Sequence, residues 1–239
     1  MTTHEIARKR NRQSELIRKM VVAGMLSAVT AVLVFTPIGM IPLPPPLPSA
    51  TTVHVPVILA ALAEGPMVGL AVSLVFGLCS LIRAWETGML GLTLFFRNPL
   101  VSVLPRLLVP LAALGAYLLW KRLIRRGAVT EKVGVAIAAA VGSVVNTAGC
   151  LGMIILLYHT DLTVMLNEMI SAGSANTAYF NHAGDWLVAA VGLPNGIGEA
   201  IVAAVLVPMI KTAVDAVTRR GGRGPGAPKQ VREGAGKSA

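Results

Sequence analysis

One arginine lies in the middle of an otherwise apolar stretch, RNPLVSVLPRLLVPLAALGAYLLW, which spans residues 97–120. An ionised side chain near the centre of a bilayer costs at least about 2.5–3.5 kcal/mol, so this residue, Arg106, must face a cavity or a partner. It could form an ion pair with Glu199, a carboxylate at a similar depth in a later apolar stretch. It could also bind the anionic group of a small solute. The two roles are compatible, because Glu199 could orient Arg106 while a solute carboxylate accepts from its remaining donors.

Four other polar residues lie in or beside apolar stretches. Asn146 fits either a hydrogen bond between helices or a contact with a ligand. Asn195 precedes Glu199 by one helical turn, so both would lie on one face of a helix. His54 fits a solvated residue at the membrane interface or a ligand contact, and Arg97 fits an interfacial anchor or an alternative site for the anion. The set predicts a polar pocket inside an apolar protein.

The residue types indicate binding rather than catalysis. The ending EGAGKS resembles a nucleotide-binding P-loop, but Val231 stands where that motif needs its first glycine, and no strand precedes it. The two cysteines, Cys79 and Cys150, are far apart in apolar stretches and have no metal-ligand spacing. We therefore expect no catalytic residue, no ATPase site, no cofactor and no metal site in this chain.

The elements that position these residues must be membrane helices. The chain of 239 residues is 54% hydrophobic and 13% charged, and its mean hydropathy is +0.70, a composition typical of integral membrane proteins. A span needs about 20 apolar residues. We predict an all-α fold with six transmembrane helices, over Met20–Ile41, Val53–Ala63, Met67–Ile82, Asn98–Trp120, Val133–Tyr158 and Trp186–Ile210.

The basic residues predict the orientation. Of the 21 Lys and Arg, 18 fall before the first span, between the fourth and fifth, or after the sixth, which are one side of a six-span protein. The positive-inside rule makes that side cytoplasmic, so both termini are expected there. The net charge of +10 then needs no nucleic-acid partner. We expect a basic cytoplasmic segment over 1–19, a membrane domain over 20–215 and a disordered basic cytoplasmic tail over 216–239.

Two further sequence features bear on the site and on assembly. Pro105 and Pro110 flank Arg106, so we expect the fourth span to be kinked there. In the first span Ala23, Ser27 and Ala31 recur every four residues, a spacing that lets helices approach closely. That stripe fits packing within the protein or docking against another membrane protein.

Five segments in a matching order resemble the substrate-binding S components of energy-coupling factor (ECF) vitamin transporters. They are the first-span stripe, TTVHVPVILAALAEGPMVGLAVSLVFGLCSLI, LPRLLVPLAAL, GSVVNTAGCLGMI and GLPNGIGEAIVAAVLVPMI, which together cover roughly residues 15–215. Within that family the chain is similar to the pantothenate-type subset, through T-x-x-H-x-P from Thr51, P-R-x-L-V, S-x-x-N-T and N-G-I-x-E-A.

The resemblance implies a multi-pass protein of the bacterial plasma membrane that captures a vitamin from outside. It implies three partner subunits, a transmembrane coupling subunit and two cytoplasmic ATPases, with Ala23, Ser27 and Ala31 as the docking face. Pantothenate is a small anion with hydroxyls and an amide, which suits Arg106 for its carboxylate and neutral amides for its polar groups. The candidate substrate-binding residues are Thr51, His54, Arg97, Arg106, Asn146, Asn195 and Glu199.

Other functions remain open from the sequence. The chain could be an S component for a different vitamin. It could be a stand-alone ion-coupled secondary transporter of a small organic anion, with Glu199 and His54 as the pieces of its ion site. An intramembrane protease would need paired catalytic motifs that are not visible in the sequence, and a pure scaffold would leave Arg106 with no use beyond an ion pair.

Overall fold

The protein is a bundle of helices with one short pair of β-strands. The computed structural model describes residues 3–41, 50–86, 91–124, 127–171 and 182–221. The elements are α1 (Thr3–Phe35), η1 (Pro37–Gly39), β1 (Met40–Ile41), β2 (Ala50–Thr51), α2 (Val55–Glu64), α3 (Pro66–Glu86), η2 (Gly91–Arg97), α4 (Pro99–Ser102), α5 (Leu104–Leu123), α6 (Ala128–Ser171), α7 (Ala183–Trp186), η3 (Leu187–Gly192) and α8 (Leu193–Gly221). The predicted all-α architecture is confirmed. Most of the predicted tail, and parts of the segments that join the first to the second and the fifth to the sixth predicted spans, lie outside the described residues.

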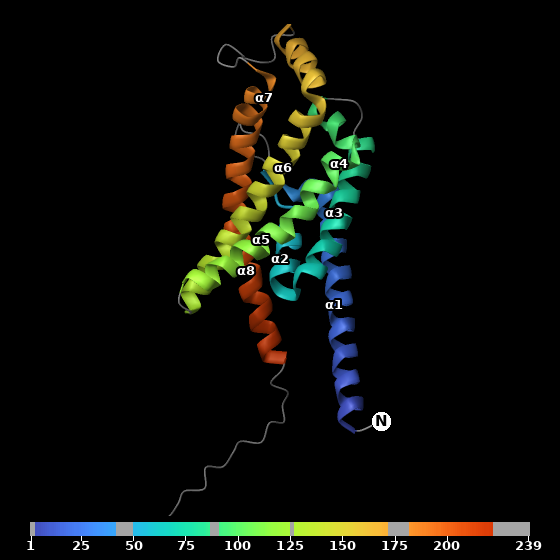
Figure 1. Cartoon of the computed structure of the whole chain (residues 1–239), viewed down its shortest axis with the longest axis vertical. Coiled ribbons are helices and arrows are strands. Elements are labelled where there is room, and N and C mark those ends of the chain that lie inside the picture. Colours follow the sequence, from blue (N-terminus) through green and yellow to red (C-terminus); the bar gives the residue numbers. More distant parts are fainter. Residues whose placement is uncertain (1–2, 42–49, 87–90, 125–126, 172–181, 222–239) are drawn as a thin grey trace, which may run out of the picture.

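Five helical segments among the described residues are long and apolar enough to cross a membrane. They are Arg8–Phe35, Pro66–Glu86, Pro99–Leu123, Val129–Glu168 and Ala183–Ala216. The second predicted span corresponds to α2, which has only 10 residues, or about 15 Å of helix against a hydrocarbon core of about 30 Å. The prediction of six spans is therefore confirmed for five, and the second span is a half-length helix. The first residues of α1 and the last of α8 lie at the same end of the bundle (Figure 1).

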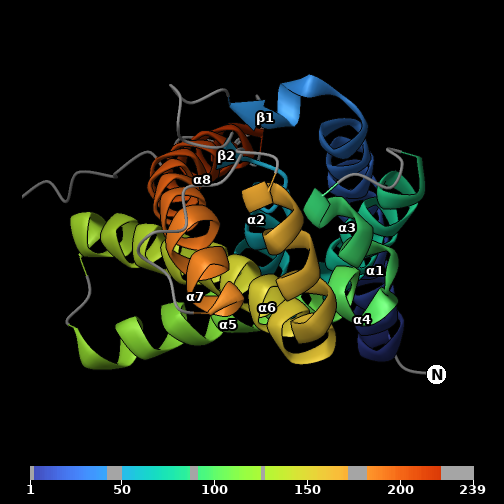
Figure 2. The same ribbon diagram turned by 90° about the horizontal axis from the view of Figure 1, so that it is seen from above.

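The half-length helix begins inside the protein. His54, which precedes the first residue of α2, is fully buried, and Val55 to Ala61 are buried as well. The chain reaches it through β2, which pairs antiparallel with β1, Met40 opposite Thr51. Extended backbone is tolerated at membrane depth where it is buried in protein, because its polar groups then find partners there. α2 consequently lies near the middle of the bundle (Figure 2).

Two prolines shape the segment around Arg106. A proline has no N–H, so it leaves the carbonyl four residues earlier without its helical partner. Pro105 does this to Val101, and the helix is interrupted at Val103, between α4 and α5. The Val101 carbonyl accepts instead from Nη1 of Arg106 at 2.7 Å. The expected kink is thus a break in the helix just before Arg106. The Arg106 side chain donates the hydrogen bond that the Val101 carbonyl cannot receive from Pro105.

The second proline is compensated by a different helix. Pro110 leaves the carbonyl of Arg106 without a helical N–H, and the hydroxyl of the buried Ser73, on α3, donates to that carbonyl. This hydrogen bond joins α3 to α5 next to the arginine. It also explains why Ser73 is buried among the apolar residues of α3.

The Ser73 bond predicts a stability effect that can be reversed. Ser73→Ala leaves the Arg106 carbonyl buried without a partner, a loss of about 1–3 kcal/mol in the free energy of unfolding. Pro110→Ala supplies the missing N–H, so the double variant Ser73→Ala/Pro110→Ala should regain much of that loss. Thermal unfolding of the purified protein in detergent measures both. If Ser73→Ala destabilises the protein equally with and without Pro110, the proposed coupling is wrong.

Close contacts between helices fix the arrangement of α5, α6 and α8. An added Cβ at Gly149 of α6 would be 2.9 Å from Cβ of Pro105 on α5, and Gly196 of α8 lies against Thr147 of α6. Positions 147 and 149 are about 200° apart around a helix. The helices α5 and α8 therefore flank α6 on opposite sides, as the view from above also indicates (Figure 2).

The helix α6 continues past the predicted end of its span. The backbone leaves helical geometry at Tyr158, with φ −130° and ψ 31°, which is where the fifth predicted span ends. The chain then resumes helix to Ser171, so that the first part of the segment between the fifth and sixth predicted spans is helical. This extension forms one wall of a pocket described below.

Candidate functional site

The helices α2 and α6 bring buried polar side chains to one level of the bundle. An added Cβ at Gly142 of α6 would be 2.9 Å from Cδ1 of Ile58 on α2, so the two helices touch there. α2 runs toward the end of the bundle where the termini lie, and α6 runs away from it (Figure 1). His54 is one turn before Ile58 and Asn146 one turn after Gly142. These two residues consequently lie at the same level, on facing sides of α2 and α6.

Several of these side chains have polar atoms that are buried without a protein partner. They are both ring nitrogens of His54, Oγ of Ser143, Oδ1 of Asn146, Oδ1 of Asn195 and Nε of Arg106. A buried polar atom that makes no hydrogen bond costs about 1–3 kcal/mol, so native proteins keep few of them and each needs an explanation. Five such residues in the membrane domain are what a site for a polar ligand requires.

Glu199 is the best-satisfied polar residue in this group. Its carboxylate accepts from the backbone N–H of Thr51 at 3.1 Å, from the hydroxyl of Thr51 at 2.5 Å and from the hydroxyl of Thr147 at 3.1 Å. It thereby joins α8 to β2 and α6 and holds the extended segment that leads to His54. Thr147 is not among the predicted site residues, although its hydroxyl is a direct partner of Glu199.

The expected ion pair between Arg106 and Glu199 is not present. Among the described residues, ion pairs within 4.0 Å join Arg18 to Glu64 and Lys211 to Asp215. The two buried charges lie at similar depth, as the sequence predicts, but on helices that flank α6 on opposite sides.

The guanidinium of Arg106 is held in an aromatic cage. It is 6% exposed, and its Cζ lies 5.4 Å from the ring centroid of Phe76 and 4.9 Å from that of Phe96. Cation–π contacts of this kind are worth about 0.5–2 kcal/mol. Nη1 donates to Val101 and Nη2 to the hydroxyl of Ser80 at 3.3 Å. The Nε–H keeps no partner among the described residues.

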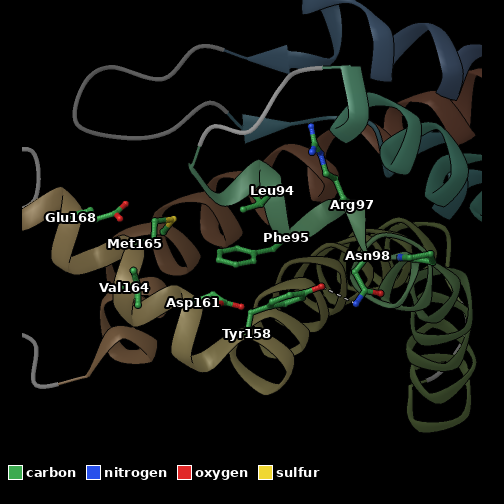
Figure 3. Close-up of a pocket in the computed structure, with 10 residues that line it drawn as sticks. Leu94, Phe95, Arg97, Asn98, Tyr158, Asp161, Val164, Met165 and Glu168 are labelled. Atoms are coloured by element: carbon green, nitrogen blue, oxygen red, sulfur yellow. Dashed lines mark hydrogen bonds between the residues drawn. The ribbon is translucent and has the colours of Figure 1, made fainter.

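Arg97, the other candidate for the anion, is engaged elsewhere. Its Nε donates to the carbonyl of Ala84 at 3.2 Å, and its guanidinium lies 4.7 Å from the ring centroid of Trp85. Arg97 also lines the pocket described next, together with Phe95 and Asn98 (Figure 3). These contacts fit an arginine that fixes η2 to the end of α3.

A pocket of about 740 Å³ opens beside η2 and the extension of α6. Phe95 and Tyr158 form its aromatic wall, with ring centroids 5.0 Å apart, and Tyr158 accepts a hydrogen bond from Nδ2 of Asn98 at 3.0 Å (Figure 3). Asp161 and Glu168, which follow Tyr158 on α6, also line the pocket. Sequence reasoning missed this pocket, because it depends on the helix that resumes after Tyr158.

The candidate docking residues of α1 face partly inward. Ala23, Ser27 and Ala31 are half-buried, and Ala23 packs against the hydrophobic core. Gly24 and Ala28, beside them, are exposed, and an added Cβ at Gly24 would meet no atom within 4 Å. The stripe therefore serves internal packing on one edge and leaves small residues exposed on the other. Among the described residues, no group of three or more His, Cys, Asp or Glu could hold a metal ion.

The geometry suits a small molecule that is anionic at one end and polar but uncharged at the other. Comparisons with known proteins agree with a transport role. The chain is 28% identical over 207 residues to the pantothenate transporter PanT of Leuconostoc mesenteroides subsp. mesenteroides, which covers 85% of this chain and 95% of that protein. The sequence profile described as "ECF transporter, substrate-specific component" matches residues 18–211. Because this match extends over most of the membrane domain, the chain belongs to the family of substrate-specific components of ECF transporters.

Proposed function

We propose that this chain captures pantothenate outside the cell and delivers it across the membrane together with a coupling subunit and two ATPases. The family membership carries the proposal: members are substrate-binding transport subunits rather than enzymes, and the chain is a multi-pass protein of the bacterial plasma membrane. The relative that is a pantothenate transporter supports the choice of vitamin. The residues of the site support it independently.

Arg106 is the proposed anchor for the pantothenate carboxylate. Its Nε–H is a buried donor without a protein partner, and its two terminal nitrogens are already fixed by Val101 and Ser80. A guanidinium that is held in place loses little entropy when it binds a carboxylate. The rings of Phe76 and Phe96 exclude water around it, which strengthens the attraction. Arg97 is assigned a structural role, because its Nε donates to the carbonyl of Ala84 and its guanidinium stacks on Trp85.

The neutral polar residues are the proposed partners of the amide and hydroxyls. His54 and Asn146 face each other across α2 and α6, and Asn195 lies one turn from Glu199 on α8. Each has a buried polar atom that a ligand could satisfy. Glu199 and Thr51 are proposed to position this side of the pocket, because their two hydrogen bonds hold the backbone next to His54.

The face of α1 is the proposed contact with the coupling subunit. Only 11% of the membrane window of α1 is buried inside the chain, the smallest share of the five spans. Ala23, Ser27 and Ala31, with the exposed Gly24 and Ala28 beside them, would let a partner helix approach closely.

Transport by a reconstituted complex tests the proposal. Proteoliposomes should contain the chain, a coupling subunit and the two ATPases, and uptake of labelled pantothenate should be measured with ATP inside. We expect accumulation that requires ATP and persists when the proton gradient is collapsed. ATPases that bind but cannot hydrolyse ATP are the matched control, and they should abolish uptake. Uptake by the chain alone, driven by a proton gradient, would contradict the proposal and identify an ion-coupled transporter.

A further inference from the structure

Two buried charges of opposite sign lie in this membrane domain without forming a pair. Arg106 and Glu199 are each 6% exposed. Each is stabilised by other groups, Arg106 by carbonyl, hydroxyl and aromatic contacts and Glu199 by the donors of Thr51 and Thr147. Burying two charges separately costs more than pairing them, so the separation needs a reason.

The two charges lie on opposite sides of one helix. Pro105, next to Arg106, contacts α6 at Gly149, while Glu199 contacts α6 at Thr147, and these positions are about 200° apart around the helix. The contacts of the two charges also differ: the Arg106 guanidinium contacts α3, α4 and η2, whereas the Glu199 carboxylate contacts β2 and α6. Asn146, between positions 147 and 149 around the helix circumference, has an unpartnered oxygen on the face that meets α2. The polar region is therefore positive at one end, neutral in the middle and negative at the other end.

The negative end is the end next to His54. The hydrogen bonds of Glu199 to Thr51 fix the segment that leads to that histidine. The partners of Glu199 among the described residues are all donors, so its oxygens act as acceptors. A second anionic group on a ligand would meet this charge at short range in a medium of low dielectric, where repulsion is strong.

We propose that Glu199 is a specificity-determining residue that admits ligands with one anionic end and rejects ligands with a second anion at the far end. This inference rests on the proposed function, in which the pantothenate carboxylate binds Arg106. The uncharged hydroxyl end of the vitamin then lies toward Glu199 and His54. A pantothenate derivative with a phosphate ester on its primary hydroxyl carries a second anion at that end and is excluded. Specificity built on a repulsive element of this kind distinguishes ligands that share every attractive contact.

A set of three ligands separates repulsion by charge from exclusion by size. The ligands are pantothenate, its phosphate ester at the primary hydroxyl, and the acetate ester at the same oxygen, which adds bulk without charge. For the wild-type chain we expect the phosphate ester to bind at least about 100-fold more weakly than pantothenate, and the acetate ester to bind at least about 10-fold better than the phosphate ester. If both esters are rejected equally, exclusion is steric and the proposal is wrong.

Substitution of Glu199 tests the residue itself. Glu199→Gln removes the charge and keeps the shape, so the ratio of the phosphate-ester affinity to the pantothenate affinity should rise at least about 10-fold. Glu199→Asp keeps the charge and should keep the ratio close to that of the wild type. Glu64→Gln is the matched control, since Glu64 is a well-buried carboxylate paired with Arg18 outside the site, and it should leave the ratio unchanged.

The outcomes separate the two levels of the proposal. An unchanged ratio in a folded Glu199→Gln variant, with pantothenate still bound by the wild type, overturns the role of Glu199 alone. A wild-type chain that binds no pantothenate overturns the proposed function and this inference with it. Binding by isothermal calorimetry, with thermal unfolding of each variant as a check of folding, provides all of these results.

Discussion

Arg106→Ala is expected to weaken pantothenate binding by about 10- to 100-fold. Hydrogen bonds to charged groups contribute about 1.5–3 kcal/mol each, and each 1.4 kcal/mol changes the affinity tenfold. The variant also removes the donors to Val101 and Ser80, so its stability should fall as well. Arg106→Lys keeps a charge but loses the planar arrangement of donors, and its affinity should lie between those of Arg106→Ala and the wild type. Equilibrium binding to the purified variants measures the effect.

Two comparisons isolate the role of Arg106 in binding. Arg83→Ala removes an arginine at the end of α3 that donates to the carbonyl of Phe35 at 3.0 Å, outside the site, and it should change the affinity by no more than about twofold, as is usual for such positions. Arg97→Ala removes the other candidate for the anion and should have a much smaller effect than Arg106→Ala. A folded Arg106→Ala protein that binds pantothenate as the wild type does would reduce Arg106 to a structural residue.

Gly69→Leu is expected to lower the free energy of unfolding by at least about 3 kcal/mol, the upper part of the range for overpacking. An added Cβ at Gly69 of α3 would lie 2.7 Å from Cβ of Ala61 on α2 and 2.9 Å from Cβ of Pro110 on α5. Neither neighbour has a flexible end that could move aside. The larger side chain must therefore separate α3 from the half-length helix and from the helix that carries Arg106. Thermal unfolding in detergent measures the loss.

Gly115→Leu is the matched control for that substitution. Gly115 lies on α5 and is exposed, and an added Cβ would meet no atom within 4 Å. The same change there should leave stability equal to that of the wild type or slightly raise it, because leucine is the better helix former. If both variants unfold alike, the close approach of α2, α3 and α5 at Gly69 is not what holds these helices together.

Hydropathy and proline positions predict most of this fold. Five of the six predicted spans are found as membrane-length helices at the apolar stretches. The break before Arg106 follows from Pro105, which has no N–H to donate. The half-length α2 could not be predicted in the same way. A hydropathy count does not distinguish a helix from buried extended backbone. The extended segment before His54 is held by a hydrogen bond between Thr51 and Glu199, which are 148 residues apart in the sequence.

The candidate site could be predicted as a set of residues but not as a set of contacts. Depth along a helix follows from residue number, so the similar levels of Arg106, Asn146 and Glu199 are visible in the sequence. The direction in which each side chain points around its helix axis is not visible in the sequence, because it depends on which glycines contact which neighbouring helices. That is why the sequence suggests an Arg106–Glu199 pair, whereas α6 lies between their helices. The donor role of Ser73 could have been found, because Pro110 frees a carbonyl that needs a partner.

The measurement that tests the central claim most directly is equilibrium binding of labelled pantothenate to the purified wild-type chain. Riboflavin, thiamine, biotin and folate serve as competitors. Tight binding that none of these four vitamins displaces is the result predicted for a pantothenate-capture subunit. Binding of one of the other vitamins in place of pantothenate would contradict the assigned substrate, and a folded chain that binds none of the five would contradict vitamin capture itself.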